Sequence, residues 1–407
     1  MATSGILRNI FPDQPNVRTL LVYNSLQGLY LGYIQVFWQP FLVTLGVSIA
    51  LIGILEASAG AYGILSSIVQ SFGGILSDRV GRRKVVISAS ALLVACWSVA
   101  SVAFVVHEQF FVIPAYVLWS LGAMGIPALD AVLADSVRSN DRPRIYALIL
   151  VANTLPSSLT GYLAGQYSQS LGATTFLLLA ALFEGLGLAI LAVRLRDAHR
   201  NPSDIESHRT KFDLRQTILN VRSHWKYFSV ISLDSLTWAV GSSLLYALLQ
   251  EGAAFTKQDF GLIALTLPLG VVFGTIPGGW LAWKIGPRRL LIISEFLGAG
   301  MMFGWALYPA SVLIPLYGFA WGVAISTWIP VQFQLSSHLF PQRNRGELMG
   351  NLGMARGLIR GIGPIIALSL FLIFGYPGPM IGGGIGILLT IVLIAKYIPS
   401  RVTLVER

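Results

Sequence analysis

Seven charged side chains lie inside long apolar stretches of this 407-residue sequence, and their types and positions suit them to chemistry. They are Glu56, Asp130, Glu184, Asp234, Glu295, Arg356 and Arg360. Because a charge in apolar surroundings is costly, such residues are either paired with each other or functional. A carboxylate that is unpaired for part of a working cycle can bind a proton, and a guanidinium can hold an anion.

Two of these charges lie at matching depths of their apolar segments. Asp234 lies about eight residues from the start of one segment and Arg356 about nine from the start of another, so at a helical rise of about 1.5 Å per residue they share a level. We predict that they form a pair. Arg360 follows Arg356 by one turn on the same helical face and has no obvious acid at its own depth, so we expect it to hold an anionic substrate.

The segments that carry these residues must be membrane helices. With 55% hydrophobic residues, 11% charged residues and a mean hydropathy of +0.70, the chain is too apolar for a soluble domain. A membrane span needs about 20 apolar residues. The segments that qualify are roughly 18–44, 49–76, 85–106, 111–137, 144–169, 173–195, 226–251, 258–283, 289–308, 311–339, 347–374 and 376–397. Their runs are continuous and lack the alternation of a barrel, which predicts an all-α integral membrane protein with twelve transmembrane helices.

Basic residues indicate the orientation of this bundle. Lys and Arg accumulate on the cytoplasmic side of membrane proteins, and here nearly all of them fall in the loops and tails of one side. Both termini and the middle of the chain are therefore expected in the cytoplasm. The net charge of +10 follows from this topology, so nucleic acid is not an expected partner. The lone Cys96 excludes an intramolecular disulfide.

One long polar stretch near the midpoint divides the chain into two halves. The expected units are a cytoplasmic tail 1–17, a six-helix half 18–195, a linker 196–225, a second six-helix half 226–397 and a tail 398–407. The first tail has no uninterrupted apolar core, so we expect no cleaved signal peptide. The linker contains either a short amphipathic helix on the inner leaflet or a merely solvated stretch.

A short charged sequence between the second and third segments is repeated in the second half. Residues 74–83 read Gly-Ile-Leu-Ser-Asp-Arg-Val-Gly-Arg-Arg, and residues 279–288 repeat its Gly, Leu, Gly and Arg at a constant offset. Two like halves around a central path are a common plan of transporters.

With its twelve segments and central linker, the chain resembles the major facilitator superfamily over essentially its whole length. The motif of that family, Gly-x-Leu-(Ser/Ala)-Asp-Arg-x-Gly-Arg-(Arg/Lys), is matched in full by residues 74–83, whereas the copy in the second half has Trp283 in place of the acid. The resemblance implies a monomeric secondary transporter of the cell membrane, whose two pseudo-symmetric six-helix halves carry a small organic solute by alternating access.

The resemblance also implies that the motif loop is a conformational latch. Asp78 is expected to cap a helix of the opposite half, the eleventh, and Arg82 to pair with Asp135, with Asp130 as the runner-up. The expected latch residues are Gly74, Asp78, Arg79, Gly81, Arg82, Arg83 and Asp135. The alternative is that these charges only fix the topology.

In that family the first, fourth, seventh and tenth helices line the transport path. Polar and aromatic side chains form stripes on the first, seventh and tenth segments here, which is typical of an apolar cavity with a few orienting polar groups. The expected substrate-binding residues are Asn24, Gln27, Gln35, Trp238, Trp321, Trp328, Gln332, Arg356 and Arg360. A packing or interfacial role for Trp321 and Trp328 remains the alternative.

The helix that carries each acid indicates whether the acid is expected to bind a proton or to have a structural role. Asp130 and Asp234 are the leading candidates for proton coupling, and Glu56 could serve instead. Glu184 and Glu295 lie on the sixth and ninth helices, which are peripheral in the family, so we expect them to be structurally paired or to snorkel toward the membrane surface.

Two classes of cargo are compatible with the sequence. Arg356 and Arg360 favour an anionic solute, whereas the tryptophans and carboxylates favour efflux of amphipathic compounds as the alternative. Two features of drug antiporters are missing: Leu118 stands where proton-coupled members often have an arginine four residues before a glycine, and residues 154–161 fit the signature of the fifth helix poorly.

An enzyme is not expected. The sequence has no metal-ligand spacing, no nucleophile elbow and no phosphate-binding loop, so no catalytic residue, metal or cofactor is predicted. A sensor would need a larger soluble domain. The expected partners are a small-molecule substrate, protons and membrane lipid.

Overall fold

A computed structural model describes residues 14–60, 63–137, 142–196, 222–340 and 345–399, and in these ranges all regular structure is helical. The helices of the first half are α2 (Pro15–Thr44), α3 (Ile49–Ala59), α4 (Ile64–Val80), α5 (Arg82–Val106), η1 (Gln109–Phe111), α6 (Val112–Gly122), α7 (Gly125–Ser136) and α8 (Arg142–Arg194). Those of the second half are α11 (Trp225–Ser242), α12 (Leu245–Gly252), α13 (Lys257–Ile285), α14 (Pro287–Leu307), η2 (Ser311–Leu313), α15 (Ile314–Leu339), α16 (Arg345–Phe374) and α17 (Pro377–Tyr397). Most of the two tails, most of the linker and its predicted amphipathic helix lie outside the described residues, whereas α2 begins within the expected tail 1–17.

The number of spans differs from the expected twelve. Among the described residues, ten helices are long and apolar enough to cross a membrane. Two features of the chain account for the difference. The span at 145–194 is 50 residues long and is interrupted at Gly172, whose positive φ of 72° breaks the helix. The 30-residue α2 is not among the ten, because asparagine, glutamines and serine dilute its apolar character.

The repeated motif is visible in the backbone. Gly81 separates α4 from α5 with a φ of 101°, and Gly286 precedes α14 with a φ of 88°. This region of φ favours glycine, which has no Cβ to clash with the backbone. The two glycines occupy corresponding positions of the two halves, so the duplication predicted from the sequence extends to local conformation.

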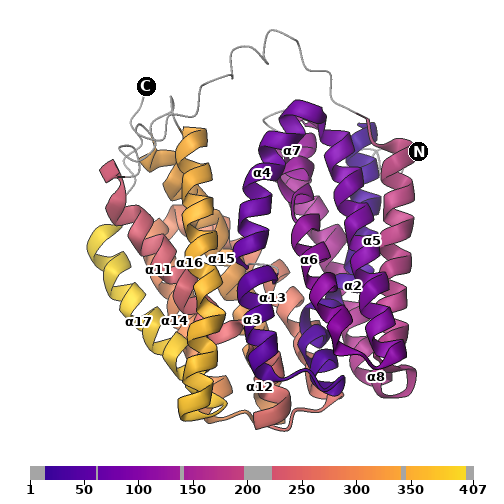
Figure 1. Ribbon diagram of the computed structural model, residues 1–407. Coiled ribbons are helices and arrows are strands. Elements are labelled where there is room, and N and C mark those ends of the chain that lie inside the picture. The colour runs from indigo at the N-terminus through magenta and orange to yellow at the C-terminus, as the bar shows by residue number, and fades with distance from the viewer. Residues whose placement is uncertain (1–13, 61–62, 138–141, 197–221, 341–344, 400–407) are drawn as a thin grey trace, which may run out of the picture.

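The two halves lie side by side in the bundle (Figure 1). Contacts between them are made by α13, which packs on α2 and α8, by α16, which packs on α3 and α4, and by α12, which packs on α2. At one point the backbones almost touch, because a Cβ added at Gly165 of α8 would overlap the Cα of Gly261 of α13. Small residues permit such approach between membrane helices.

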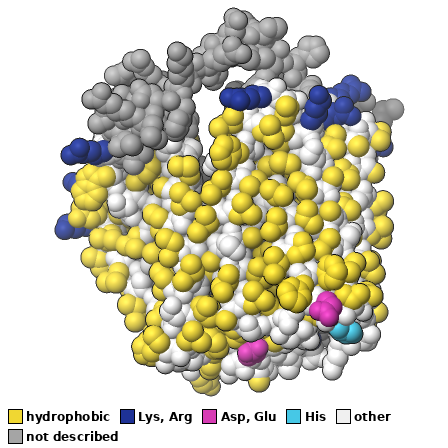
Figure 2. Space-filling view, viewed as in Figure 1, with side chains coloured by type: hydrophobic (Ala, Val, Ile, Leu, Met, Phe, Trp, Pro, Cys, Tyr) yellow, Lys and Arg dark blue, Asp and Glu magenta, His cyan; other side chains and the backbone are white. Residues whose placement is uncertain are grey.

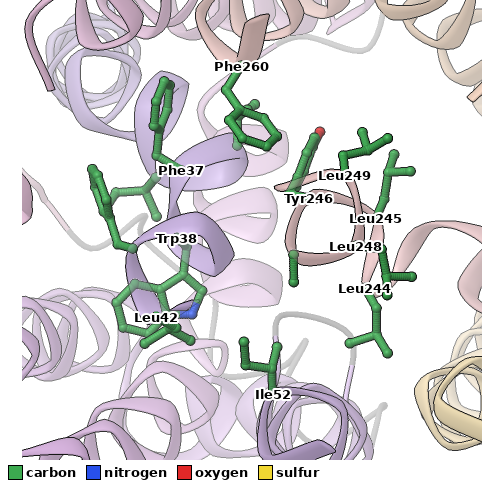
Figure 3. Close-up of a cluster of buried hydrophobic side chains, with 14 of the residues drawn as sticks. Phe37, Trp38, Leu42, Ile52, Leu244, Leu245, Tyr246, Leu248, Leu249 and Phe260 are labelled. Atoms are coloured by element: carbon green, nitrogen blue, oxygen red, sulfur yellow. The ribbon is translucent and has the colours of Figure 1, made fainter. Parts of the chain in front are cut away.

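Buried apolar side chains form one shared core and two separate cores. The shared core joins the halves, because Phe37 of α2 and Tyr246 of α12 both pack against Phe260 of α13 (Figure 3). Trp38 of α2 and Leu244, between α11 and α12, belong to the same cluster. A second core contains only residues of the second half, and a third only residues of the first. The halves are therefore joined at one end of the bundle, which we call the joined end, and have separate cores toward the other.

The surface fits a membrane protein. Hydrophobic side chains cover the side of the bundle, and Lys and Arg gather at the end opposite the joined end, which we call the basic end (Figure 2). Side chains as large as Phe72, Phe296 and Leu372 are more than half exposed, at 65%, 55% and 71%. Lipid rather than water is the medium for such a surface. At the basic end the same view shows a notch between the halves.

Candidate functional site

Arg356 is the centre of a polar cluster in the second half. Its Nε donates a hydrogen bond to the hydroxyl oxygen of Ser235 on α11 at 2.9 Å, and its Nη1 donates to the Oε1 of Gln332 on α15 at 3.2 Å. The guanidinium carbon lies 4.8 Å from the centre of the Trp328 ring, within the range of a cation–π contact. Three helices thus converge on one partly buried guanidinium.

A second set of hydrogen bonds fixes the orientation of Gln332. Its Nε2 donates to the Ser336 hydroxyl at 3.1 Å, which leaves Oε1 directed to Arg356. Tyr227 donates its hydroxyl hydrogen to the backbone carbonyl of Gln332 at 3.0 Å. The side chain that orients Arg356, Gln332, is therefore itself fixed by hydrogen bonds to Ser336 and Tyr227. Such support is expected of a preorganised site.

Two buried carboxyl groups lie beside this cluster. Asp234 of α11 and Glu295 of α14 are 2% and 0% exposed, and their carboxyl groups are neighbours that interact electrostatically. The indole nitrogen of Trp238 donates to Glu295 Oε2 at 2.9 Å. Asp234 also lies within electrostatic range of Arg356 and Arg360.

These contacts refine three expectations. Arg356 is close to Asp234, as their depths predicted, but its hydrogen bonds go to Ser235 and Gln332. Arg360 has one acid within electrostatic range, Asp234, which was expected to pair with Arg356. Because Glu295 is completely buried against α11, it does not snorkel.

The tryptophan stripe predicted on the tenth segment is divided between two places. Trp328 and Gln332 belong to the Arg356 cluster, whereas Trp321 packs on Tyr246 at a centroid distance of 6.2 Å in the shared core. Both tryptophans lie on α15, which extends from the polar cluster to the joined end. Trp321 and Trp328 therefore do not form a single binding surface.

A different buried acid lies in the first half. Glu184 of α8 is 0% exposed and accepts hydrogen bonds from Tyr23 at 3.0 Å, from Tyr30 at 2.8 Å and from Ser90. Gln27 donates to it more weakly at 3.5 Å. Glu184 therefore does not snorkel either; it ties α2, α5 and α8 together as a hydrogen-bonded carboxylate.

The other predicted polar residues of the first half lie near the basic end or along α2. Asn24 and Asp130 line the same recess of about 190 Å³, whose other walls are leucines and isoleucines, and Asp130 itself is exposed. Gln27 belongs to the Glu184 cluster. Gln35 is exposed on its helix. The spacing of Asn24 and Gln27 put them on one face of the first helix, but the two side chains have different neighbours.

Glu56 lies in a third cluster, where the two halves meet. It accepts hydrogen bonds from Tyr116 at 2.9 Å and from the side-chain amide of Gln39 at 3.2 Å. The same Gln39 amide donates to the backbone carbonyl of Ser243 at 2.5 Å, and its Oε1 accepts from the Ala247 backbone at 3.3 Å. Sequence reasoning missed Gln39, although an amide in an apolar segment beside Trp38 was a usable signal.

The motif loop is held by contacts within the first half. Arg82 forms the predicted ion pair with Asp135 and donates to the Ala131 carbonyl at 2.9 Å. Arg83 donates to the Ala192 carbonyl of α8 at 2.6 Å. Asp78 is half-exposed and lies 3.9 Å from Arg82. Gly74 and Arg79 lie on α4, where a Cβ at Gly74 would only touch Pro127.

The model of the Major Facilitator Superfamily matches residues 20–256 and 227–407. NiaP of Bacillus subtilis, a candidate niacin/nicotinamide transporter, is 27% identical over 282 residues, which are 64% of this chain and 66% of NiaP. The match therefore spans just under two thirds of that relative.

Two further matches extend the comparison. The enterobactin exporter EntS of Salmonella typhi is 24% identical over 286 residues, covering 68% of this chain and 67% of EntS. The crystal structure of the human organic anion transporter MFSD10 (TETRAN) aligns with a TM-score of 0.65 and 16% identity over 94% of this chain and all of that one. The structural likeness shows a shared fold.

Proposed function

The chain belongs to the Major Facilitator Superfamily, and on that premise we propose that it carries a small organic solute with an anionic group across the cell membrane by alternating access. It is a multi-pass membrane protein of a transporter family. We propose twelve crossings with both termini and the linker in the cytoplasm, counting α2 as one crossing and α8 as two on either side of Gly172. We place it in the plasma membrane, as a monomer and without catalytic activity.

The observation that carries the choice of an anionic cargo is the Arg356 cluster. A guanidinium that is stacked on Trp328 and oriented by Ser235 and Gln332 offers a planar donor set to a carboxylate or similar anion. Trp328 adds an apolar face for the body of an organic solute. This class of cargo agrees with NiaP, a candidate niacin/nicotinamide transporter, and with MFSD10, an organic anion transporter.

Alternating access is supported by the distribution of the cores. A bundle with a shared core at the joined end and separate cores toward the basic end can open at the basic end without unpacking either half. If the basic end is cytoplasmic, as the distribution of Lys and Arg favours, this conformation is open to the cytoplasm. Closure there would bring the end of α4 closer to the start of α16, and we propose that the loop with Asp78, Arg79, Arg82 and Arg83 then acts as the latch.

Proton coupling is the third part of the proposal. Asp234 lies next to Arg356, so a proton bound there changes the charge beside the substrate site. Asp130 faces the recess it shares with Asn24, and Glu56 lies where the halves meet. Of these acids Asp234 is the best placed to link proton binding to substrate binding.

A thermal-shift comparison of matched ligands tests the proposal. Nicotinate and nicotinamide share one ring and differ in charge, so a carrier for anions should be stabilised by nicotinate, or by other carboxylates in such acid and amide pairs, and not by the amides. Arg356→Ala should abolish the difference, while Arg79→Ala, an exposed arginine of the motif loop, should preserve it. Equal shifts for acid and amide across all pairs would contradict an anionic cargo.

Efflux of amphipathic compounds is the second candidate. The similarity to EntS, an enterobactin exporter, favours efflux. Charge reversal by Arg360→Glu separates the two, since an anion carrier should lose binding of carboxylates and a pump for amphipathic cations such as tetraphenylphosphonium should not lose binding of those.

A further inference from the structure

We propose that Asp234 and Glu295 form a carboxyl pair that shares a single proton and thereby makes a proton-binding site beside Arg356. The pair joins α11 to α14, and the ninth helix, which carries Glu295, was expected to have only a structural role. The coupling role of this pair rests on the proposed function, whereas the shared proton does not.

The geometry leaves little room for two ionised groups. Glu295 accepts a hydrogen bond from Trp238, which lies one turn after Asp234 on the same face of α11, so the two carboxyl groups are neighbours, and both side chains are almost completely buried. A hydrogen bond between two carboxyl groups requires one proton, because two carboxylates have only acceptors. Like charges at such separation in a medium of low dielectric constant repel strongly, and pairs of this kind retain one proton.

The remaining oxygens agree with this reading. Asp234 Oδ1 and Glu295 Oε1 are both buried and accept no hydrogen bond from the residues that the structure describes. A buried carboxylate without donors is costly, whereas a protonated acid can fill one of these positions with its own hydrogen. Glu295 Oε2 accepts from Trp238, so the proton bridges the other oxygens.

Packing holds the pair in place. The indole ring of Trp238 lies against Gly298 of α14, where any Cβ would overlap it, and this close approach brings the indole nitrogen to Glu295 one turn earlier. The helix α17 packs on both α11 and α14, and a Cβ at Gly386 of α17 would overlap Thr237 of α11. Because α17 holds both helices that carry the pair, the two carboxyl groups have little freedom to move apart.

The charged and titratable groups around the pair are few. Arg356 and Arg360 of α16 interact with Asp234 electrostatically, and Tyr227 lies near the start of α11, about two turns before Asp234, within electrostatic range of Arg356. The helices α15 and α17 carry Tyr317, His338, Lys396 and Tyr397, all near helix ends. The two arginines are therefore the groups that compete with the proton for the pair.

This arrangement links the proton to the anion site. When the pair holds its proton it carries one negative charge, and Arg356 can hold an anion at Trp328. When the proton leaves, the second negative charge draws the guanidinium toward the carboxylates and away from Gln332. Proton and anion would then be bound together and released together.

Infrared spectroscopy of the full-length protein in lipid nanodiscs tests the site without any substrate. We expect the carbonyl stretch of a protonated carboxylic acid at neutral pH in the wild type, and its loss in Glu295→Gln, where Asp234 is left ionised beside Arg356. An unchanged band in Glu295→Gln would overturn the proposal.

A second variant tests whether the proton is shared. Asp234→Asn removes the second negative charge, so the pH at which the Glu295 band disappears should move by more than one unit if the groups titrate as a pair. Glu184→Gln is the matched control, because it removes another fully buried acid of the membrane region and should not move that pH. If Asp234→Asn leaves the titration of Glu295 where it was, the two acids are independent and no proton is shared, whatever the outcome of the ligand experiments.

Discussion

The side-chain amide of Gln39 donates a hydrogen bond to the backbone carbonyl of Ser243 at 2.5 Å, across the boundary between the two halves. The same amide group donates to Glu56, and its oxygen accepts from the Ala247 backbone. One side chain of α2 thus satisfies groups at the junction of α11 and α12. Since these groups belong to different halves, the Gln39 side chain links the halves at the joined end.

We predict that Gln39→Leu weakens this link. The substitution keeps the apolar volume but leaves the Ser243 carbonyl and the Ala247 amide without these partners, at a cost of about 1–3 kcal/mol for buried groups. The population open at the joined end should rise, as measured by distances between spin labels on α2 and α12. Gln35→Leu, an exposed amide one turn earlier, should leave the distances unchanged. The same shift in both variants would show that Gln39 has no special role.

Close backbone approach at Gly165 gives a second prediction for the link between the halves. In Gly165→Ala the new methyl group would overlap Gly261 and the Lys257 carbonyl, so α8 and α13 must separate. Labelling of cysteines introduced along α13 should increase, against a low background because the native Cys96 is buried. Gly185→Ala of the same helix has open space around its Cβ and is the control. Equal labelling in the two variants would contradict a role for this contact.

The ion pair of the motif loop can be measured by a double-mutant cycle. Arg82→Ala and Asp135→Ala should each lower the free energy of unfolding, and their coupling energy should be about 1–3 kcal/mol because the arginine is mostly buried. Thermal unfolding in one detergent provides the values. Arg79→Ala, whose side chain is exposed, should change stability by less than about 0.5 kcal/mol. A coupling energy near zero would mean that the pair only fixes topology.

The Glu184 cluster is predicted to be structural. Tyr30→Phe removes one of the hydroxyl donors to a fully buried carboxylate and should destabilise the protein by about 1–3 kcal/mol. Ligand-induced thermal shifts should keep their size, because Arg356 belongs to a separate cluster. Tyr167→Phe, at a tyrosine that is 55% exposed, is the control for loss of a hydroxyl. A loss of the ligand-induced shift in Tyr30→Phe would instead assign Glu184 to the transport site.

Arginine at position 356 should not be replaceable by lysine. Lysine keeps the positive charge but cannot donate to Ser235 and Gln332 while stacking flat on Trp328. We expect Arg356→Lys to weaken binding of carboxylates at least tenfold, or about 1.4 kcal/mol, in titrations that follow the thermal shift against ligand concentration. Gln332→Glu, which would pair with the arginine directly, should weaken it further. Unchanged affinity in Arg356→Lys would show that only the charge matters.

Much of the fold was predictable from the sequence. Lipid admits only backbones that satisfy their own hydrogen bonds, so the length of each apolar run determined a helix, and the structure has a helix wherever a segment was expected and is described. The duplication could also be recognised in the sequence, since glycine occupies the corresponding positions 81 and 286, and both residues have a positive φ in the structure. The proximity of Asp234 and Arg356 was predicted from their depths, because the depth of each residue can be counted along its own helix from the membrane surface.

What the tertiary structure decided is the direction in which each side chain points. Glu295 was expected at the periphery, yet the rotation of α14 turns it toward Asp234, and Gln39 meets Ser243 because α2 and the end of α11 converge at the joined end. Conversely, Trp321 and Trp328 share a stripe but have different neighbours. Helix rotation and crossing are set by packing between segments far apart in the chain, and no spacing within one segment contains that information.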